Sequence, residues 1–235
     1  MKTISNLTNL DTSTKFIIIS YSRTVSSFLV SLLNDHPNIK CDGELLREVS
    51  PNPDYSKLLN NIFNVPNKTQ GFKLFYYHPL NVENKQLFET IQADKSIKII
   101  FLERTNLLRR EYSRLKANQT NVWRVTHQSK QNHDKTKIHI DINRLIAKIN
   151  NVTNSENLYK QMFQEHKHIT IQYEDLENNN RETCKKIFHF LDVHDHNVNG
   201  NTIKQNPGVL KDLIENYNEI ETHFNLNSHP RVILD

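Results

Sequence analysis

The sequence predicts an α/β protein in which a central, mainly parallel sheet is flanked by helices in three layers. Four short apolar runs rich in Ile, Leu and Phe have the length and composition of buried strands. Stretches with apolar residues at helical spacing lie between and after these runs. Strands that alternate with helices build parallel sheets covered on both faces. At 235 residues, the chain suits one domain spanning 1–235, with its core at about 16–218.

The first predicted strand, Phe16–Ile19, leads through a turn rich in Ser, Thr and Arg into a helix. Apolar residues from Phe28 to Leu33 recur at helical spacing in this helix, which Pro37 stops. The other predicted strands are 72–76, 97–102 and 169–173, and the other predicted helices are 84–93, 105–118, 140–165, 208–218 and one carrying Cys184, Ile187, Phe188 and Leu191. The polar stretch 121–137 predicts a mobile loop.

This arrangement of strands also predicts where a ligand binds. In parallel sheets, ligands bind beyond the carboxyl ends of the strands. We therefore expect the site in the loops that follow Ile19, Tyr76 and Leu102.

Composition and charge narrow the functional classes. The net charge of +4 is mild and the basic residues are spread out, whereas nucleic-acid binders concentrate them, so we expect no nucleic-acid partner. The polar start lacks the apolar region of a signal peptide, and no apolar stretch reaches the roughly 18 residues of a membrane span. Cys41 and Cys184 form neither a disulfide framework nor a zinc pattern. These features predict a cytoplasmic protein, and they leave its oligomeric state open.

The segment 20–27, with the sequence SYSRTVSS, joins the first strand to the first helix. Hydroxyl groups at the start of a helix can cap it, and its free N–H groups attract anions. Arg23 adds a planar, permanent cation suited to phosphate or sulfate oxygens. The segment is not a Walker A motif, because it lacks Gly-x-x-x-x-Gly-Lys-Ser/Thr. It predicts an anion site, and the alternative is an ordinary capped helix with a surface arginine.

The chain continues with FLVSLLNDHPNI and reaches Gly43 and Glu44. This run resembles the sulfotransferases that use 3′-phosphoadenosine 5′-phosphosulfate (PAPS), in particular the carbohydrate and tyrosylprotein branches. Their 5′-phosphosulfate loop reads Arg-Ser/Thr-Gly-Ser/Thr-Ser/Thr and precedes Leu-Leu, His-Pro and a Glu. The resemblance implies a P-loop-like fold and donor contacts from five consecutive residues: Arg23, Thr24, Val25, Ser26 and Ser27.

Val25 occupies the position of the family's loop glycine. A β-branched residue strongly disfavours positive φ. We therefore expect either a loop that reaches the anion without a left-handed residue, or donor binding that is altered or lost.

Two further segments resemble the family's nucleotide site. A strand that ends in Arg, with Ser about two helical turns later, binds the 3′-phosphate in the family, which implies Arg104 and Ser113 here. The segment KQNP at 204–207, beginning with Lys204, resembles the family's C-terminal segment that closes over the nucleotide. The YEDL sequence at 173–176 is similar to a family stretch at a strand end.

The resemblance implies in-line transfer of a sulfuryl group to an acceptor hydroxyl, leaving PAP, with catalysis by positioning and electrostatics. Glu44, where the tyrosylprotein enzymes carry their base, and His78, at a strand end, are the two candidate bases. Lys73 resembles the family lysine that stabilises the bridging oxygen as the nucleotide leaves. We expect no metal, because Lys and Arg can serve where kinases need Mg²⁺.

The acceptor and two other functions remain open at this point. The resembled branches favour a saccharide or tyrosine-like hydroxyl, with small-molecule and peptide acceptors as options. A degenerate relative that binds nucleotide without turnover is the first alternative, and Val25 favours it. A P-loop-type small-molecule kinase is the second, although the Walker lysine is missing.

Overall fold

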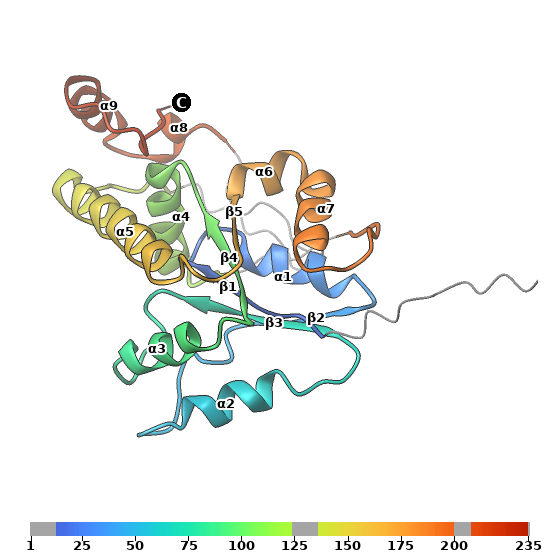
Figure 1. Ribbon diagram of the computed structural model, residues 1–235. Coiled ribbons are helices and arrows are strands. Elements are labelled where there is room, and N and C mark those ends of the chain that lie inside the picture. Colours follow the sequence, from blue (N-terminus) through green and yellow to red (C-terminus); the bar gives the residue numbers. More distant parts are fainter. Residues whose placement is uncertain (1–12, 124–135, 200–207, 235) are drawn as a thin grey trace, which may run out of the picture.

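The computed structural model of the protein describes residues 13–123, 136–199 and 208–234. Its strands form one five-stranded sheet in the order β2-β3-β1-β4-β5, and every neighbouring pair is parallel. The strands are β1 (Lys15–Ser20), β2 (Ile39–Asp42), β3 (Thr69–Phe75), β4 (Lys98–Glu103) and β5 (His168–Gln172). Helices lie on both sides of the sheet, which confirms the predicted three-layer α/β class (Figure 1).

The helices divide among three apolar clusters. One sheet face packs against α1 (Ser26–Asn34), α6 (Tyr173–Asn178) and α7 (Asn180–Phe190). The other face packs against α2 (Tyr55–Ile62), α3 (Lys85–Ala93) and the C-terminal end of α5 (Ile142–Met162). A third cluster joins α4 (Leu107–Thr120) to α5, α8 (Leu210–Leu213) and α9 (Tyr217–Leu226), so it supports the helix that follows β4.

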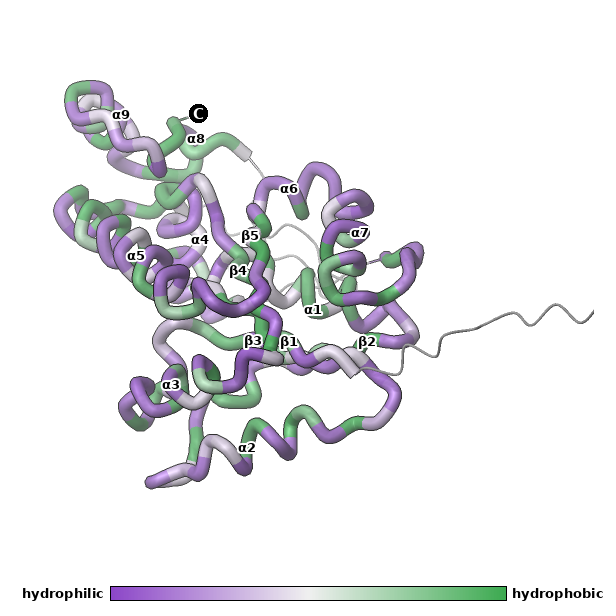
Figure 2. The backbone as a smooth tube through the Cα atoms, viewed as in Figure 1, coloured by the Kyte–Doolittle hydropathy of each residue, from purple (hydrophilic) through white to green (hydrophobic). Residues whose placement is uncertain are grey.

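Side chains of β1 alternate between the two faces because successive residues of a strand point in opposite directions. Phe16 and Ile18 belong to the cluster under α1 and α7, whereas Ile17 and Ile19 belong to the cluster under α2 and α3. All four are fully buried, and burial of such side chains stabilises the fold by about 1.5–3 kcal/mol each. Figure 2 shows hydrophobic residues along the central strands. The helices carry both hydrophobic and hydrophilic residues, as expected for amphipathic helices that bury one face.

Gly71 marks a close approach inside this core. A Cβ atom on Gly71 would lie 2.4 Å from the Phe16 ring of the neighbouring strand. Glycine therefore lets the β3 backbone and the Phe16 ring pack in contact.

The predicted elements differ from the observed ones in a few places. The strand β2 and the helix α2 were not predicted, because β2 is a four-residue edge strand with alternating polar residues and α2 is a short surface helix that buries little more than Tyr55 and Leu59. The predicted helix 208–218 is wrong as one element, since the backbone is extended at Ile214. There, the Asn216 side chain bonds both the N–H and the carbonyl of Ile140, so α8 and α9 are separate helices.

Candidate active site

The loops predicted to form the site leave β1, β3 and β4, which are neighbours in the sheet. The chain order reverses at β1, because β2 and β3 lie on one side of it and β4 and β5 on the other. Parallel sheets bind ligands at such a reversal, beyond the carboxyl ends of the strands. The first two loops are joined directly, since the N–H of Tyr76 donates to the carbonyl of Ser20 at 3.2 Å.

The loop between β1 and α1 is built on left-handed backbone. Arg23 has φ 66° and Val25 has φ 51°. The Val25 carbonyl begins α1 by accepting from the N–H groups of Phe28 and Leu29, at 2.9 and 3.0 Å. Inside the loop, Thr24 Oγ1 donates to the carbonyl of Tyr21 at 2.8 Å. The N–H groups of Ser26 and Ser27, at the start of α1, have no preceding helical carbonyl to bond, and such N–H groups bind anions.

The left-handed conformation of Val25 bears on one expectation. The sequence predicted either a loop without a left-handed residue or donor binding that is altered or lost, and the loop has a left-handed residue at Val25. Such a residue costs about 1–2 kcal/mol. The Val25 side chain packs against the core cluster that contains Leu29, and its carbonyl starts the helix. These two contacts hold the residue in a conformation that a glycine would adopt without strain.

Arginine side chains gather around this loop. Arg23 Nε donates to Ser113 Oγ at 2.9 Å, and Arg104 donates through NH1 to the Arg23 carbonyl at 3.0 Å. Arg110, which lies one turn before Ser113 on α4, donates through Nε to the Ser22 carbonyl at 3.1 Å. Burial and then the neighbouring Arg104 cation lower the pKa of Arg23 to about 10, so it remains a cation at neutral pH. The predicted residues Arg23, Arg104 and Ser113 thus meet in one place.

The guanidinium of Arg104 is buried and only partly bonded. Its head stacks over the Tyr173 ring at 3.9 Å, and its Nε is buried without a hydrogen-bond partner. Burial lowers the pKa of Arg104. A buried cation of this kind is costly unless an anion reaches it. The donor set therefore fits a phosphate group.

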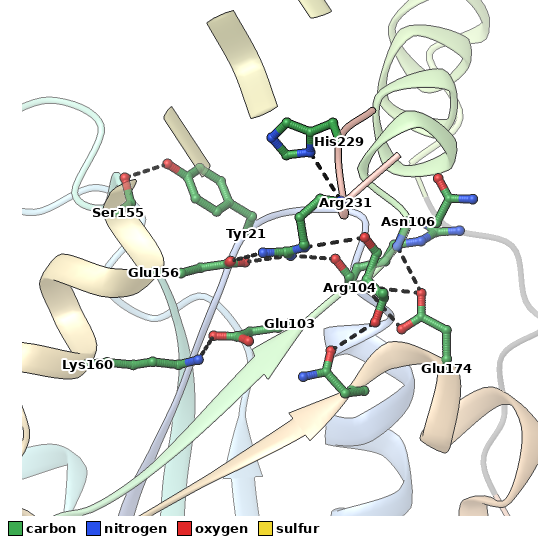
Figure 3. A network of polar contacts seen from close by, with 12 residues as sticks. Tyr21, Glu103, Arg104, Asn106, Ser155, Glu156, Lys160, Glu174, His229 and Arg231 are labelled. Atoms are coloured by element: carbon green, nitrogen blue, oxygen red, sulfur yellow. Dashed lines mark hydrogen bonds and ion pairs between the residues drawn. The ribbon is translucent and has the colours of Figure 1, made fainter. Parts of the chain in front are cut away.

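The turn that carries Arg104 is held by Glu174, the first of the two acidic residues of the YEDL sequence. The Glu174 carboxylate accepts from the N–H of Thr105 through both oxygens at 3.1 Å, and from the N–H of Asn106 at 3.2 Å (Figure 3). Asn106 in turn caps α4 by accepting from the N–H of Arg109. The sequence marked this motif, and the structure supplies its role: it shapes the turn between β4 and α4.

A second group of polar side chains extends from the start of α1 toward the loop after β2. Lys73 Nζ donates to Ser27 Oγ at 3.2 Å and lies 2.9 Å from Glu44 Oε1. The other carboxylate oxygen of Glu44 lies 3.6 Å from His78 Nε2. The Lys73 and His78 side chains are 5% and 1% exposed, whereas the Glu44 side chain is 29% exposed. Among these three predicted residues, Glu44 is the one that a substrate reaches from solvent.

His78 is held as a neutral imidazole. Burial is the main cause that lowers its pKa, to about 4, and the Arg47 and Lys73 cations lower it further, against the opposing effect of Glu44. The N–H of Phe75 donates to His78 Nδ1 at 3.4 Å. Because Nδ1 accepts, the ring carries its proton on Nε2, the nitrogen that faces Glu44.

Several residues near the site were not predicted or cannot be placed. Sequence reasoning did not assign Arg110, whose guanidinium stacks over Tyr21 at 4.7 Å. A signal existed in the basic group at 109–114, but it did not say which arginine turns inward. Trp123 is 48% exposed, and its carbonyl accepts from Arg23 at 2.7 Å. Lys204 and most of the predicted mobile loop lie outside the described residues.

Within residues 13–123, 136–199 and 208–234, no group of three or more His, Cys, Asp or Glu side chains could hold a metal ion. In the same part of the chain, no helix is long and apolar enough to cross a membrane.

Comparisons with known proteins identify the family of the chain. The family model of the Stf0 sulphotransferases matches residues 69–219, which is more than half of the chain. Nodulation protein H from Rhizobium tropici is 27% identical over 225 residues, covering 89% of this chain and 88% of that protein.

Two solved structures share the fold. A sulfotransferase from Alicyclobacillus acidocaldarius superposes with a TM-score of 0.56 and 14% identity, over 92% of this chain and 93% of that one. The sulfotransferase domain from the curacin biosynthetic pathway has a TM-score of 0.51 and 13% identity, over 79% and 76% of the two chains. With the family match, the fold and the buried cationic site taken together, the chain belongs to the Stf0 sulphotransferase family.

Proposed function

We propose that this sulfotransferase takes a sulfuryl group from PAPS and transfers it to an acceptor hydroxyl, with Glu44 as the general base. One observation carries the proposal. A buried arginine cluster and a Lys73–Glu44 ion pair lie at the carboxyl ends of the strands. Ser27, at the start of α1 beside the arginine cluster, accepts a hydrogen bond from Lys73 of the ion pair. A donor bound at the first group therefore presents its reactive end to the second.

In this proposal the two ends of the donor bind to different loops. The backbone N–H groups of residues 24–27 and the hydroxyls of Thr24, Ser26 and Ser27, with the Arg23 cation, hold the 5′-phosphosulfate at the start of α1. Arg104 and Ser113 hold the 3′-phosphate. The buried Arg104 guanidinium, which donates to the Arg23 carbonyl, supports this role, because an anion stabilises a buried cation of this kind. Lys204 is proposed to complete the nucleotide site from the C-terminal segment.

Glu44 is a better candidate for the base than His78. A general base must reach the proton that it removes, and Glu44 is far more exposed than the buried ring of His78. His78 also carries its proton on the nitrogen that faces Glu44, so it has no free lone pair directed to that side. We assign His78 the role of orienting the Glu44 carboxylate.

Glu44 accepts the hydroxyl proton, and the acceptor oxygen forms a bond to sulfur. The bond between sulfur and the bridging phosphate oxygen of PAPS breaks, and PAP leaves with the negative charge. Lys73 is proposed to donate to that bridging oxygen, since its Nζ already bonds a hydroxyl of the donor loop. Charge stabilisation by fixed cations is the main contribution expected for this type of transfer.

The acceptor is proposed to be a saccharide hydroxyl, with a tyrosine-like hydroxyl as the second class. Tyr77 is 40% exposed and packs at right angles on the His78 ring at 5.2 Å, so it offers a flat apolar surface near the proposed base. Sulfate transfer from PAPS to a panel containing both acceptor classes tests this assignment, and transfer to neither class would remove it.

The donor assignment is tested by calorimetric titration with PAP and ATP. We expect micromolar binding of PAP, much weaker binding of ATP, and loss of PAP binding in Arg104→Ala. Arg181→Ala, which removes an exposed arginine paired with Asp195, is the matched control and should bind PAP normally. Wild-type protein that does not bind PAP would overturn the donor assignment.

The base assignment is tested by Glu44→Gln, which keeps the shape and removes the charge. We expect the kcat to fall by about 10²–10⁴-fold while PAP affinity changes little. Glu48→Gln, an exposed substitution in the same loop, is the control. Unchanged turnover in Glu44→Gln would remove Glu44 as the base and favour His78.

A further inference from the structure

Arg231, near the C-terminus, forms hydrogen bonds with the backbone of the turn that carries Arg104. Its NH2 group donates to the Arg104 carbonyl at 2.6 Å, and its Nε donates to the Thr105 carbonyl at 3.3 Å. Its own carbonyl accepts from the N–H of Leu107 at 2.8 Å. Two successive residues of the turn and the first residue of α4 are therefore bonded to one distant residue.

The Arg231 guanidinium is itself anchored by α5. Its NH1 group lies 2.7 Å from Glu156 Oε2, and the Glu156 side chain is only 6% exposed. Figure 3 shows Arg231 lying between Glu156 and the turn that holds Arg104 and Asn106. A second bond joins the same tail to the turn, from Asn106 Nδ2 to the Ile233 carbonyl at 2.8 Å.

The turn is thus held from two sides. Glu174 accepts from its N–H groups, and Arg231 donates to its carbonyl groups. By contrast, the Arg104 side chain makes one hydrogen bond and one ring contact, and its Nε has no partner. The direction of the Arg104 head therefore depends mainly on the backbone from which it starts.

We propose that Arg231 is a positioning residue for recognition of the donor's 3′-phosphate, acting through the backbone of residues 104–107. This inference rests on the proposed role of Arg104 and adds a residue beyond the range 69–219 that the family model matches. Its fork geometry is essential, since a planar guanidinium bonds two carbonyls and a carboxylate at once, whereas a lysine places one point charge. Arg231 touches no part of the donor in this scheme.

The test compares PAP with adenosine 5′-phosphate, which lacks only the 3′-phosphate, in calorimetric titrations of the full chain. In Arg231→Gln we expect PAP affinity to fall about tenfold, as for loss of charge-assisted hydrogen bonds. Affinity for adenosine 5′-phosphate should stay within about twofold, because the 5′ end binds at the β1–α1 loop. The KM for PAPS should rise while the kcat changes less. Arg231→Lys should recover only part of the PAP affinity.

Controls separate positioning from general stability. Arg181→Gln removes an equal charge from an exposed pair and should leave the ratio of the two affinities unchanged. If Arg231→Gln fails to fold, Glu156→Gln tests the same role of Arg231, because it weakens the ion pair that holds the Arg231 guanidinium. The PAP affinity of Glu156→Gln should then also fall. Equal losses for PAP and adenosine 5′-phosphate, or full recovery in Arg231→Lys, would overturn the inference. Failure of the wild type to bind PAP would instead overturn the donor assignment.

Discussion

In the turn after β1, the backbone is left-handed at Arg23 and Val25, and the internal bond from Thr24 to Tyr21 closes it. In the turn after β4, neither Thr105 nor Asn106 has positive φ, and the bonds that shape the turn come from Glu174 and Arg231. The first turn stores strain within a few residues. The second turn is relaxed and is held by side chains far away in the chain. The strain in the turn after β1 should change with substitutions inside that turn. The turn after β4 should instead lose its conformation when its distant partners are removed.

The largest effect is expected from Glu174→Ala. It removes the acceptor for the N–H groups of Thr105 and Asn106, so the free energy of unfolding should fall by about 2–3 kcal/mol. PAP affinity should fall as well, because the turn carries Arg104. Urea unfolding and PAP titration measure the two effects. The exposed Glu182→Ala has the same charge change and is the control. A loss below about 0.5 kcal/mol would show that the turn holds its shape without Glu174.

The pH dependence of stability tests a third region, around the proposed base Glu44. His78, which contacts Glu44, is a buried titratable group. Its pKa is lowered from an ordinary value of 6.5 to about 4 in the folded protein. Between these values the unfolded chain binds the proton and the folded chain does not, so stability falls as the pH falls from about 6.5 to 4. The loss attributable to His78 is at most about 3 kcal/mol.

The measurement is the free energy of unfolding as a function of pH for the wild type and His78→Gln. The variant should lose a large part of the decline between pH 6.5 and 4, although buried His36, whose pKa burial also lowers, contributes in the same direction. Replacement of the exposed His139 controls for the substitution. An identical decline in the wild type and His78→Gln would contradict the neutral, buried state of His78.

The same contrast explains how much of the site the sequence could predict. Arg23 and Arg104 follow strand ends, and Ser113 lies on the helix after β4. Because parallel strands bring such ends together, the convergence of these three residues was predictable. Arg231 lies 127 residues from Arg104 in the chain, and no local pattern marks it. The inward turn of Arg110 depends on helix packing in the same way. Local chemistry is readable from sequence, whereas tertiary support is not.

A smaller effect is expected from Thr24→Val in the first turn. The substitution keeps the shape and removes the 2.8 Å bond to the Tyr21 carbonyl, which should cost about 1–2 kcal/mol because Thr24 is buried. Thr222→Val removes a bond of equal length on the exposed face of α9 and should cost less than about 0.5 kcal/mol. Equal losses in thermal or urea unfolding of the two variants would show that the internal bond does not close the turn.

The smallest effect concerns the strain at Val25 itself. A left-handed position favours Gly over Ala by about 1 kcal/mol, because only Gly lacks the Cβ that clashes there. An ordinary helix N-cap also favours Gly over Ala slightly, so the comparison needs a matched site. Val209 supplies it, since it is a valine at the N-cap of α8 with φ −82°.

We expect the stability difference between the Gly and Ala variants to be larger at position 25 than at position 209 by about 1 kcal/mol. Val25→Gly should also bind PAP at least as well as the wild type, because it keeps the loop conformation and removes its strain. A difference at position 25 no larger than at position 209 would mean that the turn after β1 is relaxed. The contrast between a strained turn and a supported one would then fail, and both turns would depend on their distant partners.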